Sequence, residues 1–497
     1  MSLLHRKSIA ELTAEADRGL LRRSLGPLDL TALGIGSIVG TGIFVFTGVA
    51  ASQHAGPALV LSMVLSAVAC ALAGLCYAEF AAMVPVAGSA YTYAYATVGE
   101  LFAWVIGWDL VLEYALSTAT VAVGWSGYLA SFTRDLGMPV PPVLTASPGT
   151  IVPDGLGGTT VALFNAPAAL IVMAVAALLI RGVRQSAGVN TALVLLKCTV
   201  LVIFIGVGAG YVQRANLTPF IPPNTGHFGE FGLSGVLRGA GVMFFAYIGF
   251  DSVSTAAQEA KNPQRDMPLG MLGSLAICTV LYIGVAIVLT GIVPYARLNV
   301  ADPLAVGIDA TDARWLSPFI KVSALFGLFS TMLVNMLGQT RIFYSMSRDA
   351  LLPPLFARVH PKFRTPHLST SLTACVVALV AGLTPISKLG ELTSIGTLLA
   401  FTLVSLGVIV LRRTAPDVPR PFRTPWVPWV PMGAMATCLL QMVSLPFETW
   451  VRLVVWLALG FVVYFAYSRQ RAAGARRQQR ADASGLTAPV DIPSSAP

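Results

Sequence analysis

The chain has 497 residues, of which 55% are hydrophobic and only 11% are charged, and its mean hydropathy is +0.75. A soluble protein carries roughly 25% charged residues, so the composition excludes a soluble enzyme, a nucleic-acid binder and a disordered protein. The formal net charge is +9. The Lys and Arg residues lie in short segments between apolar stretches, a pattern that indicates membrane topology and attraction to anionic lipid.

Apolar stretches of about 20 residues predict an integral membrane protein of twelve transmembrane helices. The predicted spans are 28–52, 57–83, 99–132, 164–181, 187–212, 233–257, 268–293, 317–346, 369–385, 391–411, 428–446 and 450–468. The third and eighth are long enough to tilt or to extend beyond the bilayer. Residues 84–99 carry no Lys or Arg, and we expect them to form either an interfacial helix or a short amphipathic linker.

Most Lys and Arg residues fall on one side of the predicted spans. The opposite side holds Arg134, Arg214, Arg297, Arg314 and Lys388. The positive-inside rule therefore predicts a multi-pass protein of the cell membrane with both termini in the cytoplasm. Residues 1–27 are then a cytoplasmic N-terminal segment, and residues 469–497 are a basic cytoplasmic tail that we expect to be disordered.

Two spans contain glycines that weaken a helix. The first reads GIGSIVGTGIF from Gly34 to Phe44, and the sixth reads GAGVMFFAYIGFD from Gly239 to Asp251. Each Gly costs about 1 kcal/mol relative to Ala, and an unwound backbone is tolerated in a bilayer only inside protein or beside a water-filled cavity. Close helix packing through small residues is the alternative for either span alone.

Spans one and six occupy corresponding positions in a five-plus-five inverted repeat, an arrangement that places a binding site at the centre. We therefore predict a first five-helix repeat at 28–212, a second at 233–411, and two further helices at 428–468. An unwound turn exposes N–H groups suited to a carboxylate and C=O groups suited to an ammonium. A zwitterionic amino acid needs both, and the stretch from Gly34 to Phe44 contains no acidic residue.

Five segments resemble the cationic amino acid transporter branch of the amino acid–polyamine–organocation superfamily, and the similarity runs from about residue 25 to 468. They are GIGSIVGTGIF, YAEFAAMVPVAGSAYTYAYATVGE, WDLVLEYALSTATVAVGWSGY, FFAYIGFDSVSTAAQEAKNPQRDMP and GQTRIFYSMSRDALLP. The resemblance implies an all-α integral membrane protein with the LeuT-type fold, in which helices one and six are discontinuous.

The resemblance also implies positions for the substrate. A substrate carboxylate would meet N–H groups near Thr41 and Gly42, and Phe250 would be an aromatic gate unless it is a packing residue. The carbonyls expected to meet the α-amine are those of Ile38, Phe245, Ala246 and Ile248.

Lys197 lies near the middle of the fifth predicted span, among apolar neighbours. A charge at this depth costs at least about 2.5–3.5 kcal/mol. In the resembled family, a lysine in this span occupies the place where sodium-coupled relatives bind a cation. Lys197 is therefore a proton site or a fixed substitute for sodium, and the alternative is a permanently charged lysine that tethers helices one and five.

Polar residues of spans three, seven and eight are candidates for the side-chain end of the pocket. Asp109 and Glu113 are four residues apart and share a helix face; Glu113 is predicted to face a cationic side chain or to transfer protons. Asn335 is predicted to bond a polar or cationic substrate tail, and Tyr282 is a weaker candidate. Helix–helix hydrogen bonds are the alternative for Glu113 and Asn335.

Other ionisable residues have structural expectations. Glu79 is expected to anchor a loop, and Asp251 to cap the helix that follows the break in span six. Arg238, Lys321 and Arg341 lie near span ends, where they snorkel or form gate salt bridges.

The function predicted from these features is secondary active transport of cationic and/or small neutral L-amino acids, with proton-coupled uptake by alternating access. The alternatives are an amino acid or polyamine exchanger and a non-transporting amino-acid sensor. The expected partners are the amino acid, protons and membrane lipids, without nucleic acid, metal or cofactor. No constellation of catalytic residues and no GxxxxGK[ST] motif is present, so we do not predict an enzyme. The sequence does not define the oligomeric state.

Overall fold

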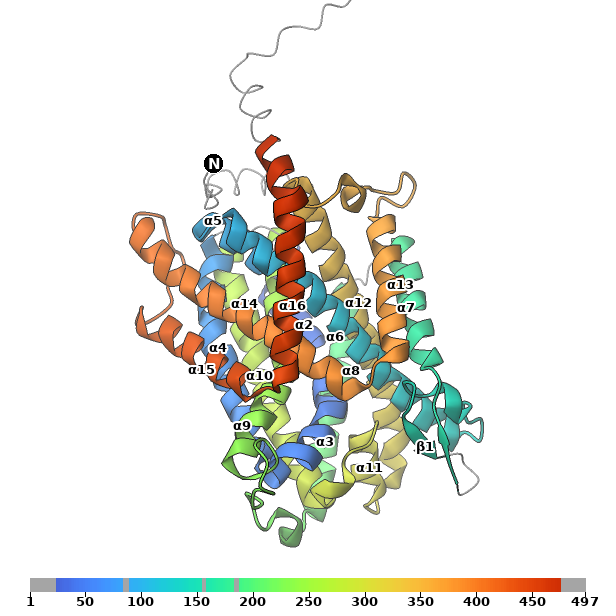
Figure 1. The fold of residues 1–497 in the computed structure, drawn as a ribbon. Helices are drawn as coiled ribbons and strands as arrows, with labels where there is room; N and C mark the ends of the chain where they lie inside the picture. Colours follow the sequence, from blue (N-terminus) through green and yellow to red (C-terminus); the bar gives the residue numbers. More distant parts are fainter. Residues whose placement is uncertain (1–23, 84–88, 154–157, 183–186, 475–497) are drawn as a thin grey trace, which may run out of the picture.

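The computed structural model describes residues 24–83, 89–153, 158–182 and 187–474. These residues are predominantly helical, with very little strand (Figure 1), which confirms the prediction of an all-α chain. The described strands are β1 Ile151–Pro153 and β2 Thr159–Val161, which pair antiparallel with Ile151 opposite Val161. The predictions for residues 1–23 and 475–497 lie outside the described residues.

Helix ends fall within a few residues of the predicted span limits, except where spans one and six are interrupted. The first half contains α2 Pro27–Ile38, α3 Thr47–Ala50, α4 Leu59–Met83, α5 Ser89–Thr97, α6 Glu100–Asp135, α7 Ala166–Ile180 and α8 Ala187–Gly208. The second half contains α9 Gly232–Met243, α10 Pro263–Ile292, α11 Pro303–Asp309, α12 Ser317–Arg348, α13 His367–Leu383, α14 Ile386–Thr414, α15 Trp429–Ser444 and α16 Phe447–Val463.

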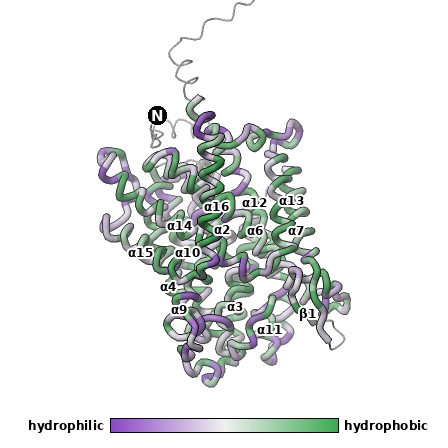
Figure 2. Tube along the Cα trace, in the orientation of Figure 1, coloured by the Kyte–Doolittle hydropathy of each residue, from purple (hydrophilic) through white to green (hydrophobic). Residues whose placement is uncertain are grey.

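The described chain has eight helical stretches long and apolar enough to cross a membrane, together with four shorter apolar helices. Hydrophobic residues dominate the middle of the bundle, and hydrophilic residues gather toward its two ends (Figure 2). α5 and the end of α16 lie at one end, whereas β1 and α11 lie at the other (Figure 1). The number of twelve spans, the two repeats and the membrane orientation stay predictions.

Part of the segment 84–99 forms the helix α5. Its residues from Ala90 to Ala96 are buried, and Tyr93 stacks on Phe80 of α4 with ring centroids 5.2 Å apart. Of the two expected forms, the helix is therefore the one observed, but it packs against protein instead of lying exposed at an interface.

Glycines let α2 lie directly against α10. A Cβ atom at Gly34 would overlap the side chain of Ser274, and a Cβ atom at Gly270 would come within 2.7 Å of Cβ of Leu30. Real Cβ atoms do not approach so closely, so these two positions require glycine as long as the helices keep this separation. The half-helix before the first break is thus packed tightly against α10.

Three indoles attach α16 to α6. Trp108 lies between Trp104 and Trp456, with ring centroids 5.5 Å and 4.6 Å away. The Nε1–H group of Trp108 donates to the carbonyl of Trp456 over 2.9 Å, and that of Trp456 donates to the carbonyl of Trp108 over 3.1 Å. Trp108 and Trp456 are partly buried, and each satisfies its donor on the neighbouring helix.

Candidate functional site

The first predicted break is present. α2 ends at Ile38, and Val39 leaves the helical region with φ −74° and ψ 90°. The helix resumes as a π-helical turn at Gly42–Phe46, followed by α3 and a second π-helical turn at Ala51–Ala55. Carbonyl groups at the end of α2 thus lose their partners along the helix and become available to other donors.

The second break lies in the sixth predicted span. α9 ends at Met243, a 3₁₀ turn covers Phe244–Tyr247, and a 3₁₀ helix runs from Asp251 to Glu259. Between them Gly249 has φ +125°, a conformation that side chains rarely adopt. The N–H group of Gly249 donates to Oδ1 of Asp251 over 3.2 Å, so Asp251 satisfies backbone at this helix start.

The two breaks contact each other. A Cβ atom at Gly42 would overlap Cα of Ala246, and one at Gly249 would come within 2.7 Å of Oγ of Ser37. Oγ of Ser252 donates to Oγ of Ser37 over 2.9 Å. Both interpretations of the glycines therefore apply: they lie where the helices are interrupted, and they also permit close packing.

Lys197 bridges α8 to the first break. Its Nζ atom donates to the carbonyls of Gly36 and Val39, both over 2.9 Å, and lies 3.4 Å from Oγ1 of Thr331 on α12. The side chain is fully buried, and no carboxylate among the described residues forms an ion pair with it. The ammonium group is thus held by the carbonyl groups that the break releases.

The predicted substrate-binding residues of spans one and six lie at the two breaks, and some of their polar atoms already have hydrogen-bond partners. The hydroxyl of Tyr282 donates to the carbonyl of Ile38 over 2.8 Å, so this carbonyl already has a partner. Oγ1 of Thr41 is buried without a hydrogen bond. Phe245 and Ala246 are buried and Ile248 is partly buried.

Phe250 is fully buried. Its ring packs against Tyr77 of α4 and Phe401 of α14, with centroids 5.9 Å and 5.2 Å away. These contacts are compatible with both the packing and the gating interpretation.

A family model described as amino acid permease matches residues 25–467. The chain belongs to the amino acid permease family. The permease is 46% identical to the methylthioribose transporter of Bacillus subtilis, over 94% of this chain and 98% of that protein. It is also 46% identical to the branched-chain amino acid permease BcaP of Bacillus subtilis, with the same two coverages. The vacuolar cationic amino acid transporter 4 of Arabidopsis thaliana is 38% identical over 84% of this chain and 68% of its own length.

The family identifies the permease as a membrane transport protein of the amino acid–polyamine–organocation superfamily, as the five sequence segments predicted. Relatives named as cationic amino acid transporters support the resemblance stated for those segments. Some of these relatives are named as vacuolar, mitochondrial or chloroplastic, so the cell membrane and the cytoplasmic termini stay predictions for this chain.

In the permease, α12 carries a row of polar residues that contact α6 and Lys197. Thr331, Asn335 and Gln339 are spaced four residues apart and therefore share one helix face. Nδ2 of Asn335 donates to Oγ of Ser117 over 2.8 Å, and Nε2 of Gln339 donates to the carbonyl of Val111 over 3.0 Å. Sequence reasoning selected only Asn335; the four-residue spacing was the signal for the other two.

Two carboxylates of α6 are buried without strong partners. Both oxygens of Asp109 and Oε2 of Glu113 have no hydrogen bond in the described structure. Asp109 packs toward α14, where a Cβ atom at Gly396 would lie 2.7 Å from Oδ1 of Asp109. Asp109 and Glu113 are therefore both buried on α6, and one carboxylate oxygen of Glu113 lacks a hydrogen-bond partner.

Glu79 and Lys321 lie in two separate polar clusters, whereas Arg341 of α12 lies 3.5 Å from Glu259. Glu79 of α4 is bidentate to Arg412 of α14, with both distances 2.9 Å, and lies 3.3 Å from Arg420. Lys321 of α12 pairs with Asp135 over 2.6 Å and lies 4.0 Å from Asp302. Glu79 therefore has the anchoring contacts expected of it, and Lys321 forms an ion pair near the start of its helix.

Proposed function

We propose that this permease takes up an α-amino acid together with a proton by alternating access, with the substrate bound between the two helix breaks. The observation that carries the proposal is the position of Lys197, whose ammonium group donates to the carbonyls of Gly36 and Val39. A titratable amine on a neighbouring helix is thus bonded directly to the half-helix that substrate binding has to reorganise.

Substrate would bind between the breaks. Its carboxylate would meet the N–H groups near Thr41 and Gly42, and its α-amine the carbonyls of Phe245, Ala246 and Ile248. The carbonyl of Ile38 would contribute if it shared its bond with Tyr282. Because Gly42 packs against Ala246, the breaks have to separate before substrate enters, and Phe250 would close over it.

The proton would act through Lys197. A protonated lysine has three N–H donors and a positive charge, and charge-assisted hydrogen bonds are roughly twice as strong as neutral ones. Loss of the proton would weaken the bonds to Gly36 and Val39 and release α2 from α8. Proton exchange at Lys197 would in this way alternate the position of the first break.

For the side chain of the substrate we propose cationic or small neutral L-amino acids, including branched-chain ones. The similarity to a branched-chain amino acid permease supports the neutral class. The buried carboxylates of Asp109 and Glu113 support the cationic class, because a substrate ammonium or guanidinium group would pair with them. Asn335 would bond a polar side chain after leaving Ser117.

The test is uptake of labelled amino acids into proteoliposomes under an imposed pH gradient, with and without sodium. We expect gradient-driven uptake that does not require sodium, loss of this uptake in Lys197→Ala, and substrate binding without coupling in Lys197→Arg, which is always protonated. Strong sodium dependence, or normal proton-driven uptake in Lys197→Arg, would reject the coupling role. Uptake that requires amino acid loaded inside would identify an exchanger.

The substrate class is tested by competition. Leucine, alanine, lysine, arginine and methylthioribose are offered as unlabelled competitors, and Glu113→Gln is compared with the unaltered protein. Selective loss of lysine and arginine competition in Glu113→Gln would assign the cationic class. Loss of all competitors together would instead indicate a proton-transfer or structural role for Glu113.

A further inference from the structure

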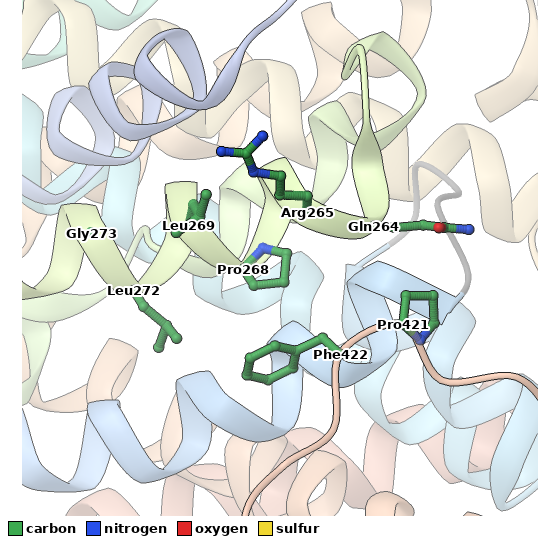
Figure 3. A pocket seen from close by; sticks show the side chains of 8 residues that line it. All are labelled: Gln264, Arg265, Pro268, Leu269, Leu272, Gly273, Pro421 and Phe422. Carbon is green, nitrogen blue, oxygen red and sulfur yellow. The ribbon is translucent and has the colours of Figure 1, made fainter.

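A groove of about 720 Å³ lies outside the two breaks, between the first turns of α10 and the segment that joins α14 to α15 (Figure 3). Its walls are formed by Pro268, Leu269 and Leu272 of α10 and by Pro421 and Phe422 of the joining segment, with Arg265 at its rim. The groove is therefore apolar over most of its length and cationic at one end.

The charge of Arg265 is available to a ligand. Arg265 is exposed, and no carboxylate among the described residues forms an ion pair with it. The adjacent carboxylate of Asp266 is buried and accepts from the N–H group of Asn262 over 3.1 Å. A guanidinium group can bind a phosphate through two parallel hydrogen bonds, so the rim of the groove is suited to an anionic headgroup.

The apolar walls begin one to two helical turns below this charge. Leu272 follows Arg265 by seven positions, which corresponds to a rise of about 10 Å along a helix. Leu269 lies between them and is 49% exposed. A ligand that joins a phosphate to a long hydrocarbon chain would contact the guanidinium group and the leucines at the same time.

The groove lies at the end of the bundle that carries α5. α10 leads to α11 at the opposite end (Figure 1), and its start is close to the beginning of the described chain, where Lys261 N–H donates to the carbonyl of Leu25 over 2.8 Å. Trp426 and Trp429, in and after the same joining segment, are 81% and 71% exposed. Exposed tryptophans of this kind mark the level of lipid headgroups.

We propose that this groove binds one anionic phospholipid of the leaflet at the α5 end, with its phosphate on Arg265 and an acyl chain along Leu269, Leu272 and Phe422. A soluble anion would bind the guanidinium group but leave the apolar walls exposed to water. A zwitterionic lipid would be attracted less strongly to the positive charge of Arg265. The proposal is independent of the transported substrate, since no residue of the two breaks lines the groove.

The test measures lipid retained by purified, delipidated protein in native mass spectra. Dioleoyl-phosphatidylglycerol is titrated against dioleoyl-phosphatidylethanolamine, and glycerol 3-phosphate is added as a soluble competitor. We expect one phosphatidylglycerol to bind at least fivefold more tightly than phosphatidylethanolamine. Arg265→Gln should remove this preference, since one cation near an anionic lipid contributes about 1 kcal/mol, which corresponds to a factor of about five in affinity.

Two further variants separate the charge from the apolar walls. Arg181→Gln removes an exposed arginine at the end of α7, outside the groove, and should leave the preference unchanged. Phe422→Ala should weaken binding of the dioleoyl lipid more than binding of dihexanoyl-phosphatidylglycerol. Equal affinities in Arg265→Gln and Arg181→Gln, equal binding of the two headgroups, or displacement by glycerol 3-phosphate would each overturn the lipid site.

Discussion

At the scale of single residues, a few glycines set how closely the breaks approach their neighbours. Gly42 brings the first break against Ala246, Gly249 brings the second against Ser37, and Gly327 of α12 leaves room for the stem of Lys197. In each case the added Cβ atom would meet a different kind of neighbour. The consequence of substitution therefore differs according to whether backbone or a flexible side chain has to move.

Gly42→Val is expected to abolish binding of every substrate. The new side chain would overlap Cα of Ala246 and occupy the space proposed for the substrate carboxylate. Overpacking of this kind costs typically about 1–3 kcal/mol, so the variant should also unfold at a lower temperature. The measurement is substrate-induced thermal stabilisation of purified protein. Gly273→Ala, whose Cβ would meet only ordinary contacts at 3.5 Å, is the control, and wild-type binding in Gly42→Val would contradict the site.

Gly327→Ala is expected to impair coupling more than folding. A Cβ atom here would lie 2.9 Å from Cε of Lys197, a flexible side chain that moves instead of backbone. The displaced amine should bond less well to Gly36 and Val39, and gradient-driven uptake should fall severalfold. Gly206→Ala on α8 has open space around its new Cβ and serves as the comparison. Undiminished uptake in Gly327→Ala would show that the position of Lys197 is unimportant.

At the scale of elements, Glu79 of α4 joins three segments through the hydrogen bonds of its carboxylate. Its side chain is 1% exposed and is bonded to Arg412 of α14 and to the N–H group of Thr424, the latter over 2.8 Å. The joining segment that supplies Thr424 also supplies a wall of the apolar groove. The carboxylate thus fixes α4, α14 and the joining segment at one point.

Glu79→Ala should therefore destabilise the protein strongly. Breaking a buried ion pair by removing one partner costs about 3–5 kcal/mol, and Glu79→Ala would leave Arg420, whose side chain is 3% exposed, without its carboxylate. The measurement is the temperature at which purified protein loses its monodisperse elution peak. Arg413→Ala, at the neighbouring exposed position, should elute normally, and equal behaviour of the two variants would refute the anchoring role.

At the scale of the whole molecule, a cluster of charged side chains links α6, α12 and the start of α11. At the α11 end, Lys321 pairs with Asp135 of α6 and approaches Asp302, which precedes α11 and accepts from Ser131. Burial raises the pKa of Asp302. Its negative charge, and the attraction to Lys321, is therefore lost at a higher pH during acidification than for an exposed aspartate.

Lys321→Met is expected to open the α11 end. The substitution leaves two carboxylates without their shared cation, so α11 and α12 should separate more often. The measurement is labelling of Thr41→Cys by a membrane-impermeant thiol reagent, in a background without the six native cysteines. Labelling should accelerate severalfold relative to Lys388→Met, which alters an exposed lysine. An unchanged rate would show that this ion pair does not restrict access.

The sequence predicted the helical class, most helix limits and both breaks, because hydropathy and glycine placement are local signals. The partners of the polar groups were not accessible in this way. Tyr282 occupies the carbonyl of Ile38, and Thr331 contacts Lys197, because helices distant in the chain meet at these points. Long-range packing of this kind leaves no local pattern, although the four-residue spacing of Thr331 and Asn335 indicated a shared face.

The stacked indoles of α6 and α16 should give a circular dichroism signal that reports the contact between these two helices. Trp108 and Trp456 lie nearly parallel, with an interplanar angle of 17° and centroids 4.6 Å apart, a geometry in which two indole transitions couple. The near-ultraviolet circular dichroism of the protein should therefore contain a paired band that disappears in Trp456→Phe. Since the two rings belong to α6 and α16 and not to the breaks, this band should report the attachment of α16 to α6. Heating would reveal whether α16 detaches before the rest of the bundle unfolds.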